Sequence, residues 1–264
     1  MKAADVLSIL RSGKPVFGAQ IISTTPMVMP FLEKMDLDIV FLDLEHIPMD
    51  REITSWMCRA FTSAGIMPLM RPPKPDASLI CQYLDAGAEG VVIPYIESPT
   101  QIRELVGAVR YRPLKGEYLE RILDGEYEMN ERTKEFLNGN VWNCNPKDKM
   151  LLINIESRPG IDHLDEILSV PGIDGVMIGP QDLSISLGIP EDYASPIFDA
   201  AVREIAEKTR AHGLFCGIHF AQTVEQAAHF INDYGLQIYL EGNELVAFVR
   251  DVGARVSSIR EKVL

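Results

Sequence analysis

Two acidic residues in the second half of the chain have the chemistry of metal ligands. Glu156 directly follows the apolar run Leu151–Ile155, and Asp182 comes shortly after the run Gly175–Gly179. Two carboxylates leave most coordination positions of a hard divalent cation open to water and to substrate oxygens, whereas a structural zinc site would use several Cys or His ligands. The pair therefore predicts a metal site, and the alternative is that both acids are surface groups or ion-pair partners.

Other polar residues at the ends of apolar runs could move protons or stabilise charge. His46 is a candidate base, because imidazole titrates near neutral pH and the adjacent Asp43 or Glu45 could raise its basicity. Arg71 could place a positive charge beside a developing enolate oxygen, or could form a structural ion pair. His219 could line the same pocket, or could be a buried structural histidine.

The elements that must position these residues are short apolar runs that alternate with amphipathic segments. Eight runs are predicted as strands: Pro15–Ile21, Ile39–Leu44, Met67–Arg71, Gly90–Pro94, Leu151–Ile155, Gly175–Gly179, Phe215–Phe220 and Ile238–Leu240. Four segments have helical spacing: Ala77–Ala86, Ser98–Val109, Pro196–His212 and Thr223–Tyr234. Most runs are apolar throughout, which is typical of parallel strands buried on both faces.

This alternation predicts an α/β fold, a (β/α)₈ TIM barrel whose active site lies where the strands end. A doubly wound open sheet is the alternative, but no glycine-rich first turn is found. The 264 residues are expected to form one domain, 1–264. The polar stretch Tyr111–Lys149 interrupts the alternation of strands and helices and is predicted to be a helix-bearing insertion after the fourth strand. Whether this insertion acts as a lid or as an interface element is left open.

Charge and cysteine content limit the partners and the compartment. The formal net charge of −13 disfavours binding to nucleic acid or to an anionic membrane surface. Cys58, Cys81, Cys144 and Cys216 are scattered, as expected for free thiols in a reducing cytoplasm. The N-terminus is predicted to be a short amphipathic helix rather than a signal peptide, and no apolar stretch approaches the length of a membrane span.

The motifs around these residues resemble one known family. They occur in family order and cover most of the chain outside Tyr111–Lys149: Phe41-Leu-Asp-Leu-Glu-His46, Met70-Arg-Pro-Pro73, Tyr83-Leu-Asp-Ala-Gly-Ala88, Ile155-Glu-Ser-Arg-Pro-Gly160 and Ile178-Gly-Pro-Gln-Asp-Leu-Ser-Ile-Ser-Leu-Gly188. The set resembles the HpcH/HpaI aldolases, the metal-dependent pyruvate aldolases related to citrate lyase β subunits. Histidine after Asp-Leu-Glu is similar to the pyruvate aldolase branch.

The resemblance implies a role for each residue and an assembly. His46 would be the base, Arg71 would stabilise the enolate, and Asp85 would reach the His46 site of a neighbouring subunit. Glu156 and Asp182 would hold Mg²⁺, Mn²⁺ or Co²⁺. Asn154, Gln181 and Asp182 would lie against the pyruvyl group. The implied assembly is a homohexamer, a trimer of dimers that exchange the last barrel helix.

The expected reaction is cleavage or formation of a carbon–carbon bond between a pyruvate enolate and an aldehyde, with a 4-hydroxy-2-oxo acid as the joined molecule. The chain departs from the family pattern at Asn154, where Gln is common, at Gln181, where Ala is common, and after Tyr111, where the usual Gly-x-Arg-Gly is absent. A CoA-ester lyase and an oxaloacetate-type decarboxylase on the same metal–enolate core are alternatives. A non-catalytic binding barrel is a further one.

Overall fold

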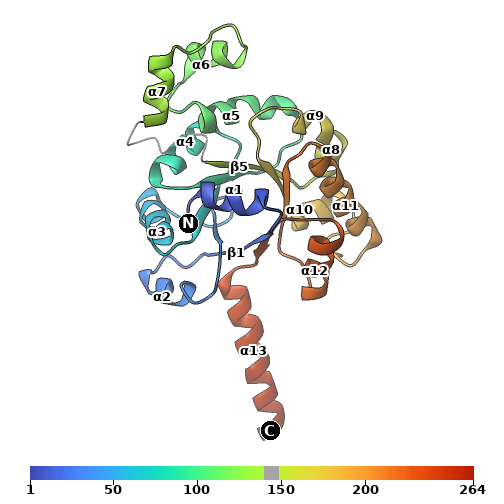
Figure 1. Ribbon diagram of the computed structural model, residues 1–264. Helices are drawn as coiled ribbons and strands as arrows, with labels where there is room; N and C mark the ends of the chain where they lie inside the picture. Colours follow the sequence, from blue (N-terminus) through green and yellow to red (C-terminus); the bar gives the residue numbers. More distant parts are fainter. Residues whose placement is uncertain (140–148) are drawn as a thin grey trace.

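Eight parallel strands close into a barrel in chain order, with each strand paired to the next and β8 paired to β1 (Figure 1). The computed structural model describes residues 1–139 and 149–264, so Cys144 and the end of the predicted insertion lie outside the described residues. The strands are β1 (Val16–Gln20), β2 (Ile39–Asp43), β3 (Met67–Arg71), β4 (Gly90–Ile93), β5 (Met150–Ile155), β6 (Gly175–Ile178), β7 (Phe215–His219) and β8 (Ile238–Glu241). The closed barrel confirms the predicted fold and excludes the open sheet.

The strands are apolar throughout because each is buried on both faces. Ile39 and Phe41 of β2 point into the barrel, where they belong to an inner core with residues of the other strands. Val40 and Leu42 of the same strand point outward and pack in a separate core beneath the surrounding helices. Successive strand residues face opposite sides, so the inward positions near the strand ends carry the side chains of the barrel mouth.

Helices connect the strands and surround the barrel. They are α1 (Ala3–Arg11), α2 (Met29–Leu32), α3 (Arg51–Ser63), α4 (Ala77–Ala86), α5 (Arg103–Arg110), α6 (Gly116–Leu123), α7 (Glu131–Gly139), α8 (Arg158–Asp162), α9 (Leu164–Leu168), α10 (Pro180–Ser186), α11 (Pro196–Ala211), α12 (Val224–Asp233) and α13 (Glu244–Val263), with 3₁₀ turns η1 (Pro26–Val28) and η2 (Pro99–Gln101). The segment predicted as one helix from Ser98 begins as η2, capped by Ser98 and Gln101, and continues as α5. Within the predicted insertion lie α6 and α7.

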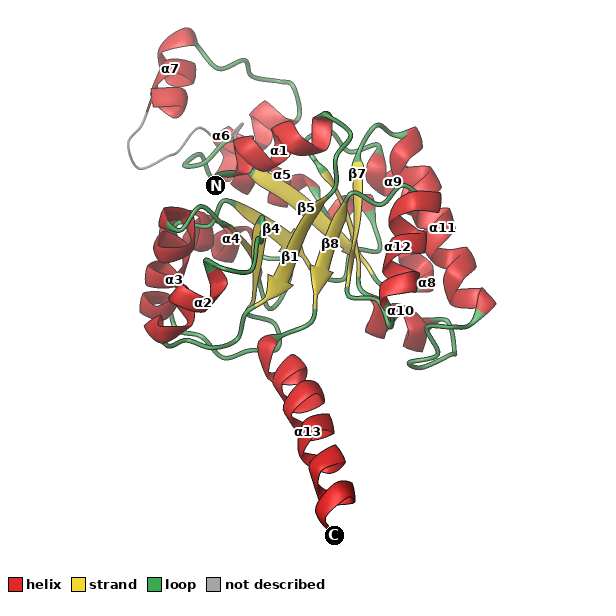
Figure 2. Cartoon of the chain, turned by 60° about the horizontal axis from the view of Figure 1, so that its bottom comes forward, coloured by secondary structure: helices red, strands yellow, loops and turns green. Residues whose placement is uncertain are grey.

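The two ends of the barrel are built differently (Figure 2). At the amino-terminal end of the strands, α1 covers the inner core with Val6, Leu7 and Leu10, so the expected amphipathic helix is confirmed. There the buried Lys149 ammonium donates to a Glu89 carboxylate oxygen at 2.8 Å. The strands run toward the other end, from which α13 departs.

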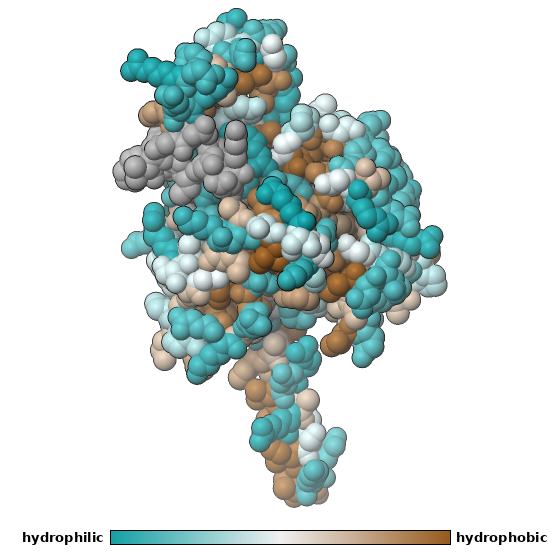
Figure 3. Space-filling view, in the orientation of Figure 1, coloured by the Kyte–Doolittle hydropathy of each residue, from teal (hydrophilic) through white to brown (hydrophobic). Residues whose placement is uncertain are grey.

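The last helix, α13, extends away from the barrel in Figures 1 and 2 and buries none of its residues. Apolar side chains along it are exposed (Figure 3), among them Phe248 at 62% and Val249 at 70%. No helix in the described part of the chain is long and apolar enough to cross a membrane.

Candidate active site

The polar residues that follow the strands converge on one cavity of about 480 Å³ at the carboxyl ends of the strands. Its lining includes most of the side chains singled out from the sequence: Asp43, His46, Arg71, Glu156, Gln181, Asp182 and His219. These residues come from five different strands or the loops after them, so only the closed barrel brings them together. A cavity with converging acids, an arginine and histidines has the composition of a small-molecule site.

Arg71 is held at the end of β3 by two acids from the end of β2. Its Nε and Nη2 donate to the two carboxylate oxygens of Asp43 at 2.9 and 2.7 Å, and its Nε lies 3.1 Å from Glu45 Oε2. The strand register sets this pair, because Asp43 and Arg71 are direct neighbours in the β2–β3 ladder. Arg71 Nη1 donates no hydrogen bond to any residue that the structure describes, so this end of the guanidinium can donate to a ligand.

Burial and ion pairing shift the pKa values of these acids in opposite directions. Burial alone would raise the pKa of Asp43, but the hydrogen bonds and positive charge of Arg71 outweigh it and hold the pKa below the usual value. Burial raises the pKa of Glu45, although Arg71 opposes the shift. The Asp43 carboxylate and the Arg71 guanidinium therefore stay charged, and Arg71 is a fixed cation in the mouth.

Glu156 is a deeply buried acid of the cavity, with 2% of its surface exposed. Its Oε1 accepts from the backbone N–H of Tyr95 at 2.7 Å, and its Oε2 accepts from the Asn154 side-chain amide at 2.9 Å. Tyr95 has a φ of +53°, a conformation that costs energy for a non-glycine residue and is often retained at functional sites. The strained turn after β4 thus directs a backbone donor at Glu156.

Gly179 makes room for the same carboxylate. A Cβ placed on Gly179 would lie 2.2 Å from Glu156 Oε2 and 2.9 Å from Glu156 Cβ. Because no side chain fits there, the Glu156 carboxylate can lie against the start of α10, the helix that carries Asp182. This close approach explains why glycine stands between β6 and α10.

The two acids fit a divalent cation. Burial raises the pKa of Glu156 to about 7, and the negative charges of Asp182 and Glu45 add to the shift. A buried carboxylate with a second acid beside it is relieved by a bound cation. Within residues 1–139 and 149–264, no group of three or more His, Cys, Asp or Glu side chains could hold a metal. The Glu156 and Asp182 carboxylates would therefore hold such a cation as a pair, and its other positions would be filled by water and ligand oxygens.

His46 lies at the outer edge of the cavity. Its side chain is 61% exposed, and its Nε2 lies 3.8 Å from Glu45 Oε2. Since Glu45 also contacts Arg71, the histidine and the arginine share one acidic neighbour. A solvent-accessible imidazole in this place can exchange protons with a bound molecule and with water.

Three predicted site residues do not line the cavity: Asn154, Asp85 and Glu45, the last of which contacts Arg71 and His46. Asn154 is buried beneath the cavity and contacts Glu156 rather than the open space. Asp85 lies on α4, outside the barrel, where its carboxylate is 62% exposed and 3.5 Å from Arg112 Nε. Asp85 therefore takes no part in the site of its own chain.

Sequence reasoning missed Gln20 and Asn243. The Gln20 side chain points inward from β1 and donates to Asp43 Oδ2 at 3.2 Å, while its Oε1 accepts from Asn243 at 3.4 Å. Asn243 also caps α13 through the backbone N–H of Val246. A continuous polar chain thus runs from the start of α13 to Asp43 and Arg71. A polar residue at the end of the first apolar run was the available signal for Gln20.

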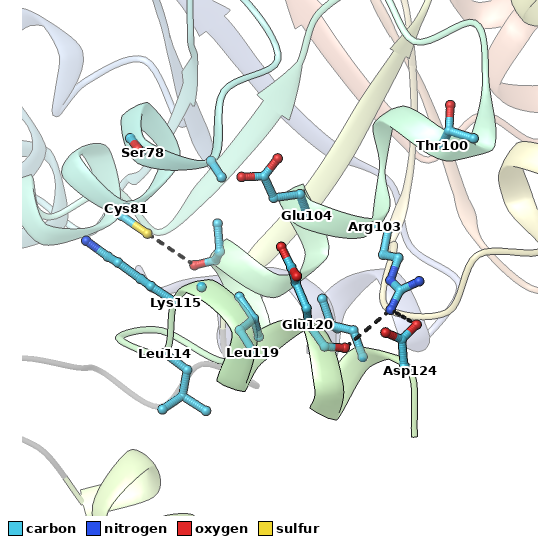
Figure 4. Close-up of a pocket in the computed structure, with 14 residues that line it drawn as sticks. Ser78, Cys81, Thr100, Arg103, Glu104, Leu114, Lys115, Leu119, Glu120 and Asp124 are labelled. Carbon is cyan, nitrogen blue, oxygen red and sulfur yellow. Dashed lines mark hydrogen bonds and ion pairs between the residues drawn. The ribbon is translucent and has the colours of Figure 1, made fainter. Parts of the chain in front are cut away.

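A second cavity, of about 500 Å³, lies outside the barrel between α4, α5 and α6 (Figure 4). Its wall combines the carboxylates of Glu104 and Glu120 with the Arg103–Asp124 ion pair. None of the residues predicted to carry chemistry lines it. We assign it no role in the reaction.

Comparison with known proteins identifies the family to which the sequence is related. The family model described as HpcH/HpaI aldolase/citrate lyase matches residues 18–242. A hydroxypyruvate/pyruvate aldolase from Deinococcus radiodurans is 34% identical over 210 residues, which are 78% of this chain and 73% of the relative. A 2-keto-3-deoxy-L-rhamnonate aldolase from Escherichia coli is 34% identical over 209 residues, 79% of this chain and 76% of the relative.

The fold has a matching counterpart among solved structures. The crystal structure of an HpcH/HpaI aldolase from Desulfitobacterium hafniense superposes with a TM-score of 0.80 at 25% identity. The superposition covers 97% of this chain and 96% of that protein, so the likeness extends over the whole barrel and is not confined to the motifs.

Proposed function

Because the chain belongs to the HpcH/HpaI aldolase/citrate lyase family, we propose that its barrel mouth cleaves or forms the bond between a pyruvate enolate and an aldehyde, with Glu156 and Asp182 as metal ligands. The protein is a carbon–carbon lyase of the aldolase type. Class II aldolases of this family generally depend on a divalent metal. The observation that carries the proposal is the meeting of Glu156, Asp182, Arg71 and His46 in one cavity.

In the proposed cleavage, a 4-hydroxy-2-oxo acid binds with its keto-acid end toward Glu156 and Asp182. A bound Mg²⁺, Mn²⁺ or Co²⁺ would act as a Lewis acid that polarises the 2-oxo group and stabilises negative charge on its oxygen. Asn154 and the Tyr95 N–H orient the Glu156 carboxylate. Gln181, exposed at the start of α10, lies next to Asp182 and is proposed to contact the pyruvyl group.

His46 is the proposed base. It takes the proton of the 4-hydroxyl group, the C3–C4 bond breaks, and its electron pair passes into the keto acid to give the enolate and a free aldehyde. Arg71, fixed by Asp43 and Glu45, presents positive charge to the developing oxyanion. Protonation of the enolate carbon then gives pyruvate, and the addition reaction is the reverse sequence.

An assay with alternative substrates tests the proposal. Two rates are measured: the release of pyruvate from 4-hydroxy-2-oxo acids, and the consumption of pyruvate when it is mixed with aldehydes. Both should require a divalent metal, and both should fall at least about 100-fold in Glu156→Gln. Oxaloacetate decarboxylation without any aldehyde reaction would instead assign the decarboxylase. Cleavage of a malyl-CoA-type ester alone would assign the CoA-ester lyase, and absence of all three would leave a binding barrel.

We also propose that the chain assembles through α13 as a hexamer, a trimer of dimers that exchange this helix. Leu245, Phe248, Val252, Val256 and Ile259 recur at helical spacing on α13 and are 42–62% exposed. Phe17, which points outward from β1, is also 43% exposed. A second copy whose α13 covers β1 would bury both surfaces, and it could bring Asp85 to a neighbouring mouth.

The oligomeric state tests the assembly. Phe248→Asp should shift the protein to smaller species in sedimentation velocity, because a charge in a buried apolar contact is costly. Ile197→Asp is the matched control, since Ile197 is similarly exposed, at 54%, but lies on α11. Equal sedimentation of all three proteins would contradict the exchange of α13.

We further propose that residues 1–264 act as one domain in the cytoplasm. The free thiols Cys58, Cys81 and Cys216 support a reducing compartment.

A further inference from the structure

One histidine of the cavity has hydrogen-bonding capacity that the protein does not use. His219 points inward from the end of β7, and its Nε2 is a buried atom with no hydrogen-bond partner among the described residues. A buried polar atom without a partner is costly unless a ligand or water satisfies it. The neighbouring polar residues differ in this respect, because Gln20 is bonded to Asp43 and Asn243, and Glu241 accepts from the Tyr239 hydroxyl at 2.7 Å.

The ring of His219 is held in a fixed orientation. Phe41 lies edge-on to it with centroids 5.0 Å apart, and Phe220 lies edge-on at 5.8 Å. Phe220 itself has a φ of +59°, an unfavourable conformation for a bulky residue, and contacts Tyr193 at 5.5 Å. A strained residue that buttresses a histidine beside a cavity is a feature expected of a ligand site.

The position of His219 in the barrel indicates which part of a bound molecule it meets. Glu156, Asp182 and Arg71 lie at the ends of β5, β6 and β3, where the keto-acid end is proposed to bind. The arc of β7, β8 and β1 forms another part of the wall, with His219, Glu241 and Gln20 along it, and β2 with Asp43 and His46 lies between this arc and β3. With the keto-acid end bound as proposed, this wall is left to the aldehyde-derived half of the substrate.

The chemistry of the wall favours a neutral polar group over an anion. Burial and the positive charge of Arg71 lower the pKa of His219 to about 4, so at neutral pH the ring is uncharged and has one donor and one acceptor nitrogen. Glu241 adds negative charge to the wall, and Arg250, which also lines the cavity, lies 3.0 Å from Asp251. A hydroxyl group can donate to or accept from a neutral imidazole, whereas a carboxylate would meet the Glu241 charge.

We propose that His219 Nε2 hydrogen-bonds a hydroxyl group on the aldehyde half of the substrate, which selects hydroxyaldehydes over unsubstituted and carboxylate-bearing aldehydes. The inference rests on the proposed function and adds to it the residue that determines which aldehydes are accepted. His219 is a specificity residue in this account, and no proton transfer is assigned to it.

The test compares aldehydes that differ by one group. The value of kcat/KM for addition of pyruvate is measured with glycolaldehyde, acetaldehyde and succinic semialdehyde, for wild type, His219→Leu and His219→Gln. Wild type should prefer glycolaldehyde to acetaldehyde by about 10-fold or more, and His219→Leu should lower this ratio by about 10-fold. His219→Gln, whose amide can also donate and accept, should keep part of the preference.

The control is His212→Leu, because His212 lies at the end of α11 near Asp165, away from the cavity, and should leave the ratio as in wild type. An unchanged ratio in both His219 variants, or a wild-type preference for succinic semialdehyde, would overturn the role of His219 while the aldolase function stands. If the wild-type protein with Mg²⁺ neither adds pyruvate to any aldehyde nor exchanges the pyruvate methyl protons, both the role of His219 and the aldolase function are overturned. Should His219→Leu fail to fold by circular dichroism, His219→Gln alone decides.

Discussion

Replacing Asp43 by Asn tests whether Arg71 depends on its buried partner. The substitution keeps the shape of the side chain but removes the charge that faces a guanidinium only 6% exposed. Removing one member of a buried ion pair costs about 3–5 kcal/mol. We expect the lower end, about 3 kcal/mol, because Glu45 remains 3.1 Å from Arg71 Nε.

The chain contains a matched control. Arg158 donates to Asp162 through Nε and Nη2 at 2.9 and 2.7 Å, the same distances as in the Arg71–Asp43 pair, but both side chains are about half exposed. Asp162→Asn should therefore cost less than about 1 kcal/mol. Urea unfolding of the metal-free proteins measures both losses as shifts of the midpoint at unchanged slope.

The pH dependence of the Asp43 effect has a definite sign. The pKa of Asp43 is lowered in the folded protein, so its contribution is present above the ordinary value of about 3.9 and is lost as the pH falls through the lowered value. The difference between wild type and Asp43→Asn should therefore shrink in acid. Losses of similar size for the buried and exposed variants at pH 7 would refute the reasoning.

Three further predictions concern the Glu156–Asp182 pair and the ion pair at the amino-terminal end of the strands. Gly179→Ala should lower kcat at least about 100-fold with the fold retained by circular dichroism, because the new Cβ would occupy the place of Glu156 Oε2; near-wild-type turnover would contradict the tight fit. Because the pKa of Glu156 is about 7, the carboxylate binds a proton below that pH. The Mn²⁺ affinity measured by calorimetry should therefore rise about 10-fold from pH 6 to pH 8 in wild type and not in Glu156→Gln. The same pH dependence of Mn²⁺ affinity in both proteins would contradict Glu156 as a ligand. Lys149→Met should destabilise the protein by about 3 kcal/mol, because Glu89 would be left buried without its ammonium partner. Lys134→Met, which removes an exposed ion pair, should shift the urea midpoint far less.

The sequence was sufficient for the barrel and for the acids at its mouth. Eight apolar runs in order predicted eight strands, and Glu156 and Asp182 could be found because each follows such a run. The inward or outward direction of a side chain could not be predicted, because a strand buried on both faces has no polar alternation to set it. This is why Gln20 was missed. Asn154 was expected at the ligand because of the family resemblance, and it lies beneath Glu156, to which its amide donates.

Backbone features of the site had no signal in residue type. The left-handed conformations of Tyr95 and Phe220 arise from tertiary contacts, since neither Tyr nor Phe favours them. The need for glycine at position 179 likewise follows from the path of the Glu156 side chain, which comes from a different strand. Such constraints become visible only when the strands are placed side by side.

The central claim is that the Glu156–Asp182 pair holds the cation that stabilises the enolate, and exchange of the pyruvate methyl protons tests it most directly. Proton NMR in D₂O with Mg²⁺ follows the loss of the methyl signal without any aldehyde present. Wild type should exchange these protons, while a chelator, Glu156→Gln or Asp182→Asn should each slow the exchange at least about 100-fold. Exchange at the wild-type rate in the chelator or in either variant would contradict the account.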